Sequence, residues 1–382
     1  MIARAFLACL LALQLGVAPA AAATADECRP KRGTQQLPGA EPWAQKRLDP
    51  KRVWPLSTGA GVRVAIIDSG VELNHPQLRL AGRADLTNTG IRDCIGHGTA
   101  VAGIIGAVYV EGVPFHGMAP AAQLLSYKQT NTERDGDPDL MVKAIRSAAD
   151  EGADVINISS ATTDFPALRD AVAYALAKDV VIVAAAGNKR AEDGTPIPAY
   201  PASYEGVLAV GAAGQSGALS EFSNDKTPVS VLGPGESITS TWPGKAYNLE
   251  LEGTSYAVPY VAGVVALVRA RFPTLDQDQV RRRVIATADL GTGTTTAGMV
   301  NPMQAVSAVL PFEPANAPVV APPPPAPLPP GAVAAVPPVD HAARSLGLIV
   351  AASALGLVLL VAVARALVPM GRRRGWRPGR TD

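Results

Sequence analysis

The sequence has few charged residues, few aromatic residues and few cysteines. Charged residues make up 18% of the 382 positions and aromatic residues 5%, and 34 basic residues against 33 acidic ones give a formal net charge of +1. A chain without an overall positive field is not expected to bind nucleic acid. Three cysteines exclude a disulfide-rich scaffold and a zinc site of four thiolates. The hydrophobic share of 48% is high enough for a large folded core and excludes a disordered polymer.

The N-terminal residues 1–23 have the pattern of a secretory signal peptide. Arg4 gives the positive start, residues 6–17 are apolar except for Gln14, and small residues at 18–23 suit cleavage. The alternative is a first transmembrane helix, but the apolar part is short and ends in proline and alanine. Cys9 lies inside this segment and would be removed with it.

The C-terminal residues predict a membrane anchor. Residues 346–364 form an uncharged run of 19 residues, which as a helix would reach roughly 28 Å, close to the hydrocarbon thickness of a bilayer. We place the transmembrane helix at 345–366 and a basic cytoplasmic tail at 367–382, because an arginine cluster stays inside. Before the helix, residues 311–344 form a Pro-rich linker, with 12 prolines in 311–340. The chain is therefore expected to cross the plasma membrane once, with its bulk outside.

Once the signal peptide is removed, Cys28 and Cys94 remain. An oxidising compartment favours a disulfide between them, and the alternative is two independent thiols. Such a bond would close a loop of about 67 residues, a constraint of roughly 4 kcal/mol in the chain-entropy treatment. It would attach the N-terminal segment to the loop just before His97.

The middle of the chain alternates strand and helix patterns. Asp137 and Pro138 open a helix to about residue 150, Asp164 and Pro166 open another to about 178, and a capping box at 274–277 starts a third to about 287. Apolar runs between these segments predict strands at 62–67, 124–128, 155–159, 180–185 and 207–210. This alternation predicts an α/β fold with a mostly parallel, doubly wound sheet and helices on both faces. Reactive groups in such sheets gather at the carboxyl ends of the strands.

Three short segments carry the side chains of a serine hydrolase. Asp68 ends the first predicted strand, His97 lies in the sequence GHGT at 96–99, and Ser255 ends GTS at 253–255, which opens an apolar helix to about residue 271. Serine is a weak nucleophile until an imidazole takes its proton, and the imidazole needs a carboxylate to fix its tautomer. Each residue alone is weak evidence, since Asp at a strand end and Gly-x-Ser in a loop are common. Together, in the order Asp, His, Ser, they predict a catalytic triad.

These segments resemble the signature blocks of the subtilisin-like serine proteases, the subtilases. The matching stretches are DSGV at 68–71, GHGTAVAG at 96–103, AAAGN at 184–188 and GTSYAVPYVAG at 253–263, and the resemblance covers about residues 50–310. It implies a subtilisin-like catalytic domain at 51–310 after an N-terminal extension at 24–50. It also implies that Asn188 helps to stabilise an oxyanion, although a turn residue would suit the same position. The segments implied to bind substrate contain Ser159, Ser160, Ala185, Ala186 and Gly187.

The layout as a whole resembles the mycosins, membrane-anchored subtilases associated with type VII secretion. The shared features are the signal peptide, a cysteine in the N-terminal extension, the Pro-rich linker and the C-terminal span. The resemblance implies a protein or peptide substrate and a type VII secretion membrane complex as partner. Two functions remain open: an endopeptidase that processes secreted substrates, and a scaffold that stabilises the secretion complex with proteolysis secondary.

The sequence departs from the common subtilase pattern in several places. Tyr256 replaces the small residue or Met that many subtilases have after the nucleophile, Val258 replaces a Ser or Thr, and Tyr260 replaces a His. Tyr256 would narrow the pocket beside the nucleophile. About 44 residues separate the expected cleavage site from Asp68, too few for the usual folded inhibitory propeptide. The region 108–116 lacks an Asn-rich calcium loop. We therefore expect no metal and no cofactor.

Overall fold

The computed structural model describes residues 28, 32–34, 37–132, 136–189, 197–289, 296–313 and 341–375. The expected signal peptide, nearly all of the Pro-rich linker and the end of the basic tail lie outside these residues. The chain divides into two units, Met1–Pro323 and Pro324–Asp382, which are described one at a time.

The described part of the first unit holds a seven-stranded sheet, a two-stranded hairpin and helices. Its strands are β1 (Arg63–Asp68), β2 (Leu80–Asp85), β3 (Gln123–Lys128), β4 (Val155–Ile158), β5 (Val181–Ala185), β6 (Leu208–Ala213), β7 (Val231–Pro234), β8 (Ile238–Trp242) and β9 (Ala246–Leu251). Its helices are α1 (Trp43–Leu48), α2 (Pro50–Val53), α3 (His97–Gly106), α4 (Pro138–Asp150), α5 (Pro166–Ala177), α6 (Thr254–Arg271), α7 (Gln277–Ala286) and α8 (Pro302–Ser307).

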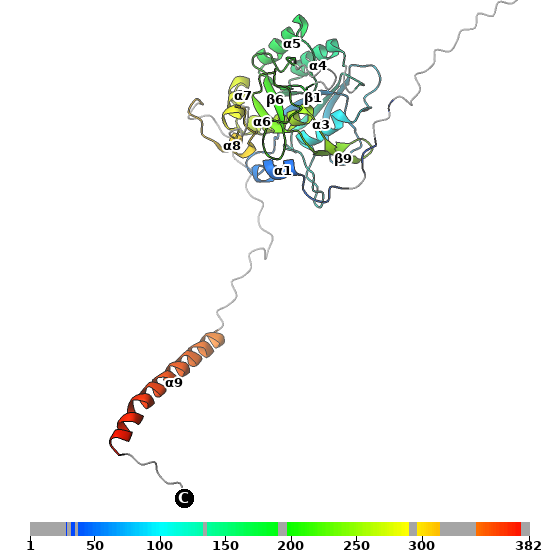
Figure 1. Ribbon diagram of the computed structural model, residues 1–382. Coiled ribbons are helices and arrows are strands. Elements are labelled where there is room, and N and C mark those ends of the chain that lie inside the picture. Colours follow the sequence, from blue (N-terminus) through cyan, green and yellow to red (C-terminus); the bar gives the residue numbers. More distant parts are fainter. Residues whose placement is uncertain are drawn as a thin grey trace, which may run out of the picture. The chain divides into compact units, whose positions relative to one another are not determined.

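The large sheet has the strand order β2-β3-β1-β4-β5-β6-β7, and every neighbouring pair is parallel. Figure 1 shows β1 and β6 of this sheet among the surrounding helices. The side chains of β1 show why both faces are covered. Val64 and Ile66 belong to one buried apolar cluster, and Ala65 and Ile67 belong to another. Residues that alternate along a strand point to opposite faces, so the near-continuous apolar runs of this sequence fit a sheet buried on both sides.

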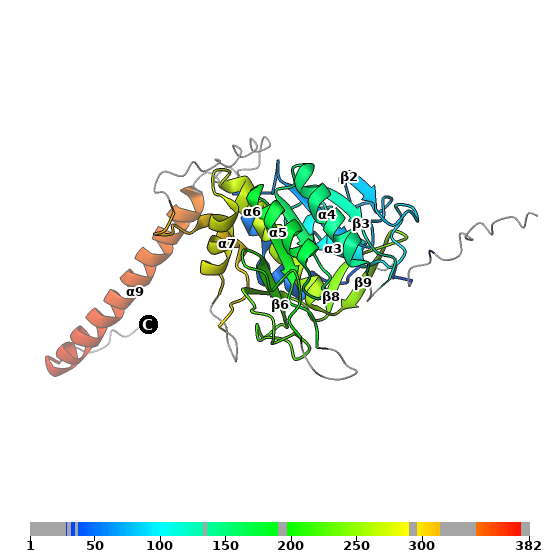
Figure 2. The same ribbon diagram turned by 90° about the horizontal axis from the view of Figure 1, so that it is seen from above.

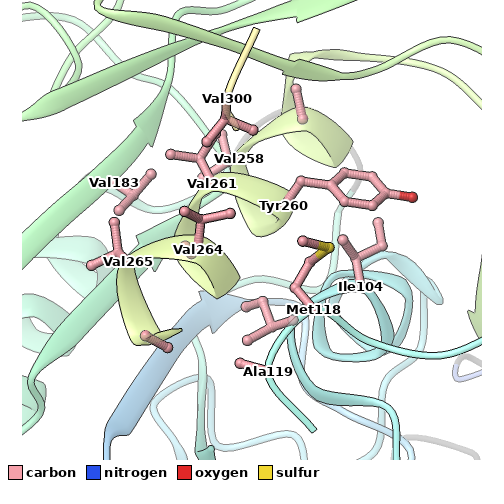
Figure 3. Packing of buried hydrophobic residues seen from close by; sticks show 14 of the residues in the cluster. Ile104, Met118, Ala119, Val183, Val258, Tyr260, Val261, Val264, Val265 and Val300 are labelled. Carbon is pink, nitrogen blue, oxygen red and sulfur yellow. The ribbon is translucent and has the colours of Figure 1, made fainter. Parts of the chain in front are cut away.

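Helices α3 and α6 cover the first face of the sheet. Helix α6 packs across β4, β5, β6 and β7, and α3 packs against both α6 and β8. Figure 3 shows Val261, Val264 and Val265 of α6 in this core, near Val183 of β5, with Ile104 of α3 close by. Because α6 is buried on nearly all sides, its residues are apolar all round rather than along one stripe. The helix that begins at the predicted nucleophile is thus fixed in the core.

Helices α4 and α5 lie side by side on the second face, as Figure 2 shows. Helix α4 begins as the sequence predicted: the Asp137 side chain accepts a hydrogen bond from the backbone N–H of Asp139, and Pro138 is the first helical residue. Its buried residues, such as Met141 and Ile145, face the cluster that contains Ile67. Both faces of the predicted doubly wound sheet are therefore covered by helices.

Two expected helix starts were wrong in detail. The capping box of α7 is formed by Asp276 and Gln279 and not by residues 274–277, so the helix begins two residues later than a box starting at Thr274 would place it. Asp164 does not cap α5: its carboxylate binds the Arg169 guanidinium and accepts from the Tyr204 hydroxyl. Helix α5 begins at Pro166 after Phe165, without a side-chain cap, because the Asp164 carboxylate is used by these tertiary partners.

The hairpin β8–β9 is tied to both α3 and the N-terminal extension. The Ser240 and Thr241 hydroxyls donate to the carbonyl oxygens of Ala100 and Thr99 in α3, at 2.6 and 2.8 Å. On the other strand, Thr34 exchanges two backbone hydrogen bonds with Tyr247, each 2.8 Å long. The extension is therefore packed into the unit as part of the fold.

The structure contains the disulfide between Cys28 and Cys94, which are 66 positions apart. Replacing both by serine is expected to lower the free energy of unfolding by about 4 kcal/mol, because the unfolded chain regains the entropy that the closed loop removes. Thermal unfolding of wild type with and without reductant should show a lower Tm for the reduced protein, and the double variant should ignore the reductant. Equal Tm values for all four samples would contradict this.

Two buried histidines predict loss of stability in acid. Burial lowers the pKa of His75 and of His116 below the ordinary value of 6.5. For His75, burial outweighs the Ala246 carbonyl, which lies 3.1 Å from Nε2 and favours the protonated ring, while Nδ1 accepts from the Gln77 N–H as only the neutral ring can. A lowered pKa in the folded state gives stability that is present above about pH 6.5 and is lost as the pH falls further. Denaturant midpoints should fall between pH 7 and pH 5, and less so in a His75→Gln variant; a flat profile would refute the expectation.

The described part of the second unit is one helix, α9 (His341–Arg373). Residues Ser345–Arg373 have a mean hydropathy of 2.8 in their most apolar window, and none of that window is buried. At 29 residues this stretch is about 44 Å long, enough to cross a bilayer with some tilt. It extends beyond the predicted span 345–366 and makes α9 a candidate membrane-spanning helix.

Candidate active site

The predicted Asp68 and His97 meet directly. Asp68 is the last residue of β1 and His97 the first residue of α3. His97 Nδ1 lies 2.8 and 3.0 Å from the two carboxylate oxygens of Asp68, which is 5% exposed. Because a carboxylate only accepts hydrogen bonds, Nδ1 carries the proton, and Nε2 of the neutral ring keeps its lone pair. The pair is therefore set up to use Nε2 as a base.

Ser255 and Asn188 both lie beside Gly253. Ser255 is the second residue of α6, and Asn188 follows β5. A Cβ on Gly253, whose φ is 142°, would lie 3.2 Å from Ser255 Oγ and 3.3 Å from Asn188 Nδ2. Any side chain there would fill the space that the hydroxyl and the amide share. Thr254 fixes the amide, since its N–H and its hydroxyl both donate to Asn188 Oδ1, at 3.0 and 2.9 Å. The amide thus turns its N–H₂ donor toward Ser255.

One cavity of about 510 Å³ is lined by all four of these residues. It lies at the carboxyl ends of the central strands, where a doubly wound sheet is expected to carry its site. The N-terminus of α6 adds a partial positive charge, which favours negative charge near Ser255. Among the described residues, none before Asp68 lines the cavity, so the described part of the N-terminal extension leaves it open.

The residues that the resemblance assigned to substrate binding divide into two groups. Ser159, Ser160, Ala185 and Gly187 line the cavity. The hydroxyl oxygens of the two serines accept hydrogen bonds from the buried amides of Asn157 and Gln129, at 2.9 and 3.2 Å.

Ala186 does not line the cavity. It is fully buried, and both of its backbone groups already have partners: its N–H donates to Val210 and its carbonyl accepts from the Asn224 amide. The structure therefore does not bring it together with the other four.

Tyr256 narrows the cavity on the side of His97. Its ring centroid lies 5.0 Å from that of His97 with an interplanar angle of 46°, and it is 8% exposed. The other two departures, Val258 and Tyr260, are fully buried in the core (Figure 3). Of the three, only Tyr256 lines the cavity.

Part of the cavity wall was missed by sequence reasoning. Trp242, Asn248 and Leu251 belong to the hairpin β8–β9, which lacks the uniform apolar run that marked the parallel strands. Gln129 and Thr130 directly follow β3, so the rule that chemistry follows the carboxyl ends of strands would have found them. Within the described residues, no group of three or more His, Cys, Asp or Glu side chains is placed to hold a metal ion.

Comparison with known proteins gives the family. Residues 59–305 match the sequence model of the subtilase family, Peptidase S8. The chain is 39% identical over 284 residues to mycosin-4 of Mycobacterium tuberculosis (strain ATCC 25618 / H37Rv), a match that spans 63% of this chain and 62% of mycosin-4. It is 36% identical to mycosin-3 of the same organism, over 88% of this chain and 86% of mycosin-3.

The fold has a solved counterpart. The crystal structure of MycP1 from the ESX-1 type VII secretion system superposes with a TM-score of 0.67 and 31% identity, over 76% of this chain and 92% of that one. The chain belongs to the subtilase family of serine endopeptidases and is mycosin-like within it.

Proposed function

We propose that this protein is a membrane-anchored, extracytoplasmic serine endopeptidase in which Asp68, His97 and Ser255 form the catalytic triad. The contact between His97 Nδ1 and the Asp68 carboxylate is the observation that carries the proposal, because it places the ring proton on Nδ1 and makes Nε2 the basic nitrogen, in a cavity that His97 and Ser255 both line. The mycosin-like domain and the candidate span of α9 supply the setting.

The proposed reaction is a two-step acyl transfer through Ser255. His97 Nε2 takes the proton of the Ser255 hydroxyl as its Oγ attacks the scissile carbonyl carbon, and Asp68 stabilises the imidazolium that forms. The developing oxyanion is met by the Asn188 side-chain N–H₂ and by the Ser255 backbone N–H at the start of α6. The imidazolium then protonates the leaving amine, which leaves an acyl group on Ser255. Water, activated by the same imidazole, releases the acyl group as the second product and restores the serine.

A peptide-library cleavage profile of the purified full-length chain tests this proposal. We expect internal peptide bonds to be cut, with a preference set by the residues that line the cavity. A folded chain that cuts no peptide and no protein substrate would contradict the proposal.

Membrane anchoring by α9 has its own expected result. Introducing Leu355→Arg and Leu359→Arg in the middle of the span costs about 2.5–3.5 kcal/mol for each arginine and should release the chain from membranes after an alkaline wash. The matched pair Leu355→Ala and Leu359→Ala should stay bound. Retention of the arginine variant would show that α9 is not the anchor. In our proposal the basic tail after α9 lies in the cytoplasm, by the positive-inside rule.

A scaffold role within a type VII secretion complex is the second candidate. It is supported by the way the N-terminal extension is built into the fold: Trp43 Nε1 donates to the Glu236 carbonyl, Gln45 Nε2 donates to the His116 carbonyl, and Ala44 and Leu48 are buried. A segment packed in this way is a permanent part of the surface offered to partners. A strain with Ser255→Ala that still secretes, beside a deletion strain that does not, would establish the scaffold role. Loss of secretion in both strains would tie it to proteolysis.

A further inference from the structure

Asp93 is a buried carboxylate four residues before His97 that the mechanism above does not use. It is 3% exposed, and burial raises its pKa. Its Oδ1 accepts from the N–H of Ile95 at 3.0 Å, the N–H of Gly96 at 2.7 Å and the hydroxyl of Ser69 at 2.9 Å. Its Oδ2 accepts from the N–H and the hydroxyl of Thr99, at 2.9 and 2.6 Å. Both carboxylate oxygens accept from backbone N–H groups, which can only donate, and these hydrogen bonds oppose the rise in pKa that burial causes. The geometry is therefore that of the anion.

The backbone donors on Asp93 flank His97 on both sides. Ile95 and Gly96 precede it, and Thr99 lies in the first turn of α3 behind it. Gly96 has φ of 96°, and a Cβ there would lie 2.4 Å from the Trp242 ring. The turn therefore also packs closely against β8. One carboxylate therefore fixes the direction in which the chain enters α3, and with it the placement of the His97 ring.

The fifth donor connects Asp93 to Asp68. Ser69 Oγ lies 2.9 Å from Asp93 Oδ1 and 3.2 Å from Asp68 Oδ1, and it accepts from the Gly98 N–H at 3.0 Å. A hydroxyl has one proton to donate, and the shorter distance gives it to Asp93. Asp68 then keeps the Ser69 N–H and His97 Nδ1–H as its partners. Without Asp93, the Ser69 hydroxyl would turn to Asp68 and compete with His97 for its charge.

We propose that Asp93 is a positioning residue for the Asp68–His97 pair, which it holds through the turn before α3 and through the Ser69 hydroxyl. The inference rests on the proposed function. According to this inference, the placement of the base His97 depends on Asp93 as well as on Asp68. Asp93 touches neither the substrate nor the reacting atoms.

The test compares the Asp93→Asn variant with the same change at a matched carboxylate, Asp85→Asn, in the full-length protein. Asp85, at the end of β2, likewise accepts from two backbone N–H groups and a threonine hydroxyl. Unlike Asp93, it has no hydrogen bond to the residues around His97. Asp93→Asn should lower kcat by about 10- to 100-fold with KM within twofold, while Asp85→Asn should leave both near wild type. Equal kcat values for the two variants would overturn the inference.

The pH profile separates positioning from loss of folding. Asp93 is joined to Asp68 through the Ser69 hydroxyl, and Asp68 in turn contacts His97. The nearby cations are Lys128, which interacts electrostatically with both Asp93 and Asp85, and Arg92, the preceding residue. Removing the anion makes the imidazolium less favourable, so the acidic limb of kcat/KM in Asp93→Asn should move to lower pH. A lower plateau with an unmoved limb would mean a structural role only, and would contradict the proposal.

If Asp93→Asn fails to fold, Ser69→Ala tests the second connection in the proposal, the hydrogen bond from the Ser69 hydroxyl to Asp93. It removes only the hydroxyl and should lower kcat several-fold. Because the Asp93 anion stays in place and no hydroxyl competes for Asp68, the acidic limb should not move to lower pH. Wild-type kinetics in folded Ser69→Ala would count against this connection and therefore against the inference. Failure of wild type itself to cut any peptide would instead refute the proposed function, and the inference would fall with it.

Discussion

Ser255→Ala should reduce kcat by about 10⁶-fold, the order of magnitude known for the same change in subtilisin. Removing the hydroxyl removes the nucleophile, and neither His97 nor Asn188 can supply another. The loss should appear in kcat on the best peptide of the library, while the affinity for that peptide is retained, because the other residues that line the cavity stay in place.

The matched control for this change is Ser216→Ala. Ser216 is an exposed serine in a turn, where its hydroxyl oxygen accepts from the Ala218 N–H. This variant should keep wild-type kcat and KM. A Ser255→Ala protein that retains more than a small fraction of the wild-type rate would mean that the hydrolysis uses another residue.

Asn188→Ala should lower kcat by about 10²- to 10³-fold with little change in KM, which is the cost of one oxyanion donor in subtilisin. The ground-state carbonyl gains little from the amide, whereas the tetrahedral oxyanion depends on it, so the loss falls on kcat. The alanine also removes the acceptor for the Thr254 N–H and hydroxyl, which loosens the first turn of α6. We therefore expect the upper end of this range.

Asn131→Ala is the control for Asn188→Ala. Its amide is exposed and donates to the Thr89 hydroxyl. It should leave the kinetics unchanged. If Asn188→Ala raised KM and preserved kcat, the amide would be a substrate-binding group and not an oxyanion donor.

The parallel sheet could be predicted because its strands are buried on both faces. Each of β1, β3, β4, β5 and β6 appears in the sequence as a short apolar run, and the observed bounds differ from the predicted ones by a few residues at most. The edge strand β2 was missed because none of its residues is fully buried, two of the six are exposed, and its apolar pattern is weak. The hairpin β8–β9 was missed for a related reason: it is held by tertiary contacts to α3 and to the N-terminal extension, which leave no local periodicity.

The contact of Asp68 with His97 could be predicted from the sequence, but the hydrogen bonds of Ser69 and Asp93 that surround it could not. The order of the motifs and their position at strand and helix ends predicted that the two side chains would meet, and their atoms lie 2.8 Å apart. Nothing in the sequence showed that the Ser69 hydroxyl donates its hydrogen bond to Asp93 and not to Asp68, because that depends on a difference of 0.3 Å between the two distances. The role of Ala186 could not be judged either, since the burial of its backbone groups depends on Val210 and Asn224.

The most direct test of the triad is to map a fluorophosphonate adduct on the full-length chain by mass spectrometry. Such a probe reacts only with a serine whose proton is taken by a positioned base. The adduct should lie on Ser255, form at the wild-type rate in Ser216→Ala and vanish in His97→Ala. An adduct on another serine, or an unmodified Ser255 in folded protein, would contradict the claim that these three side chains act together.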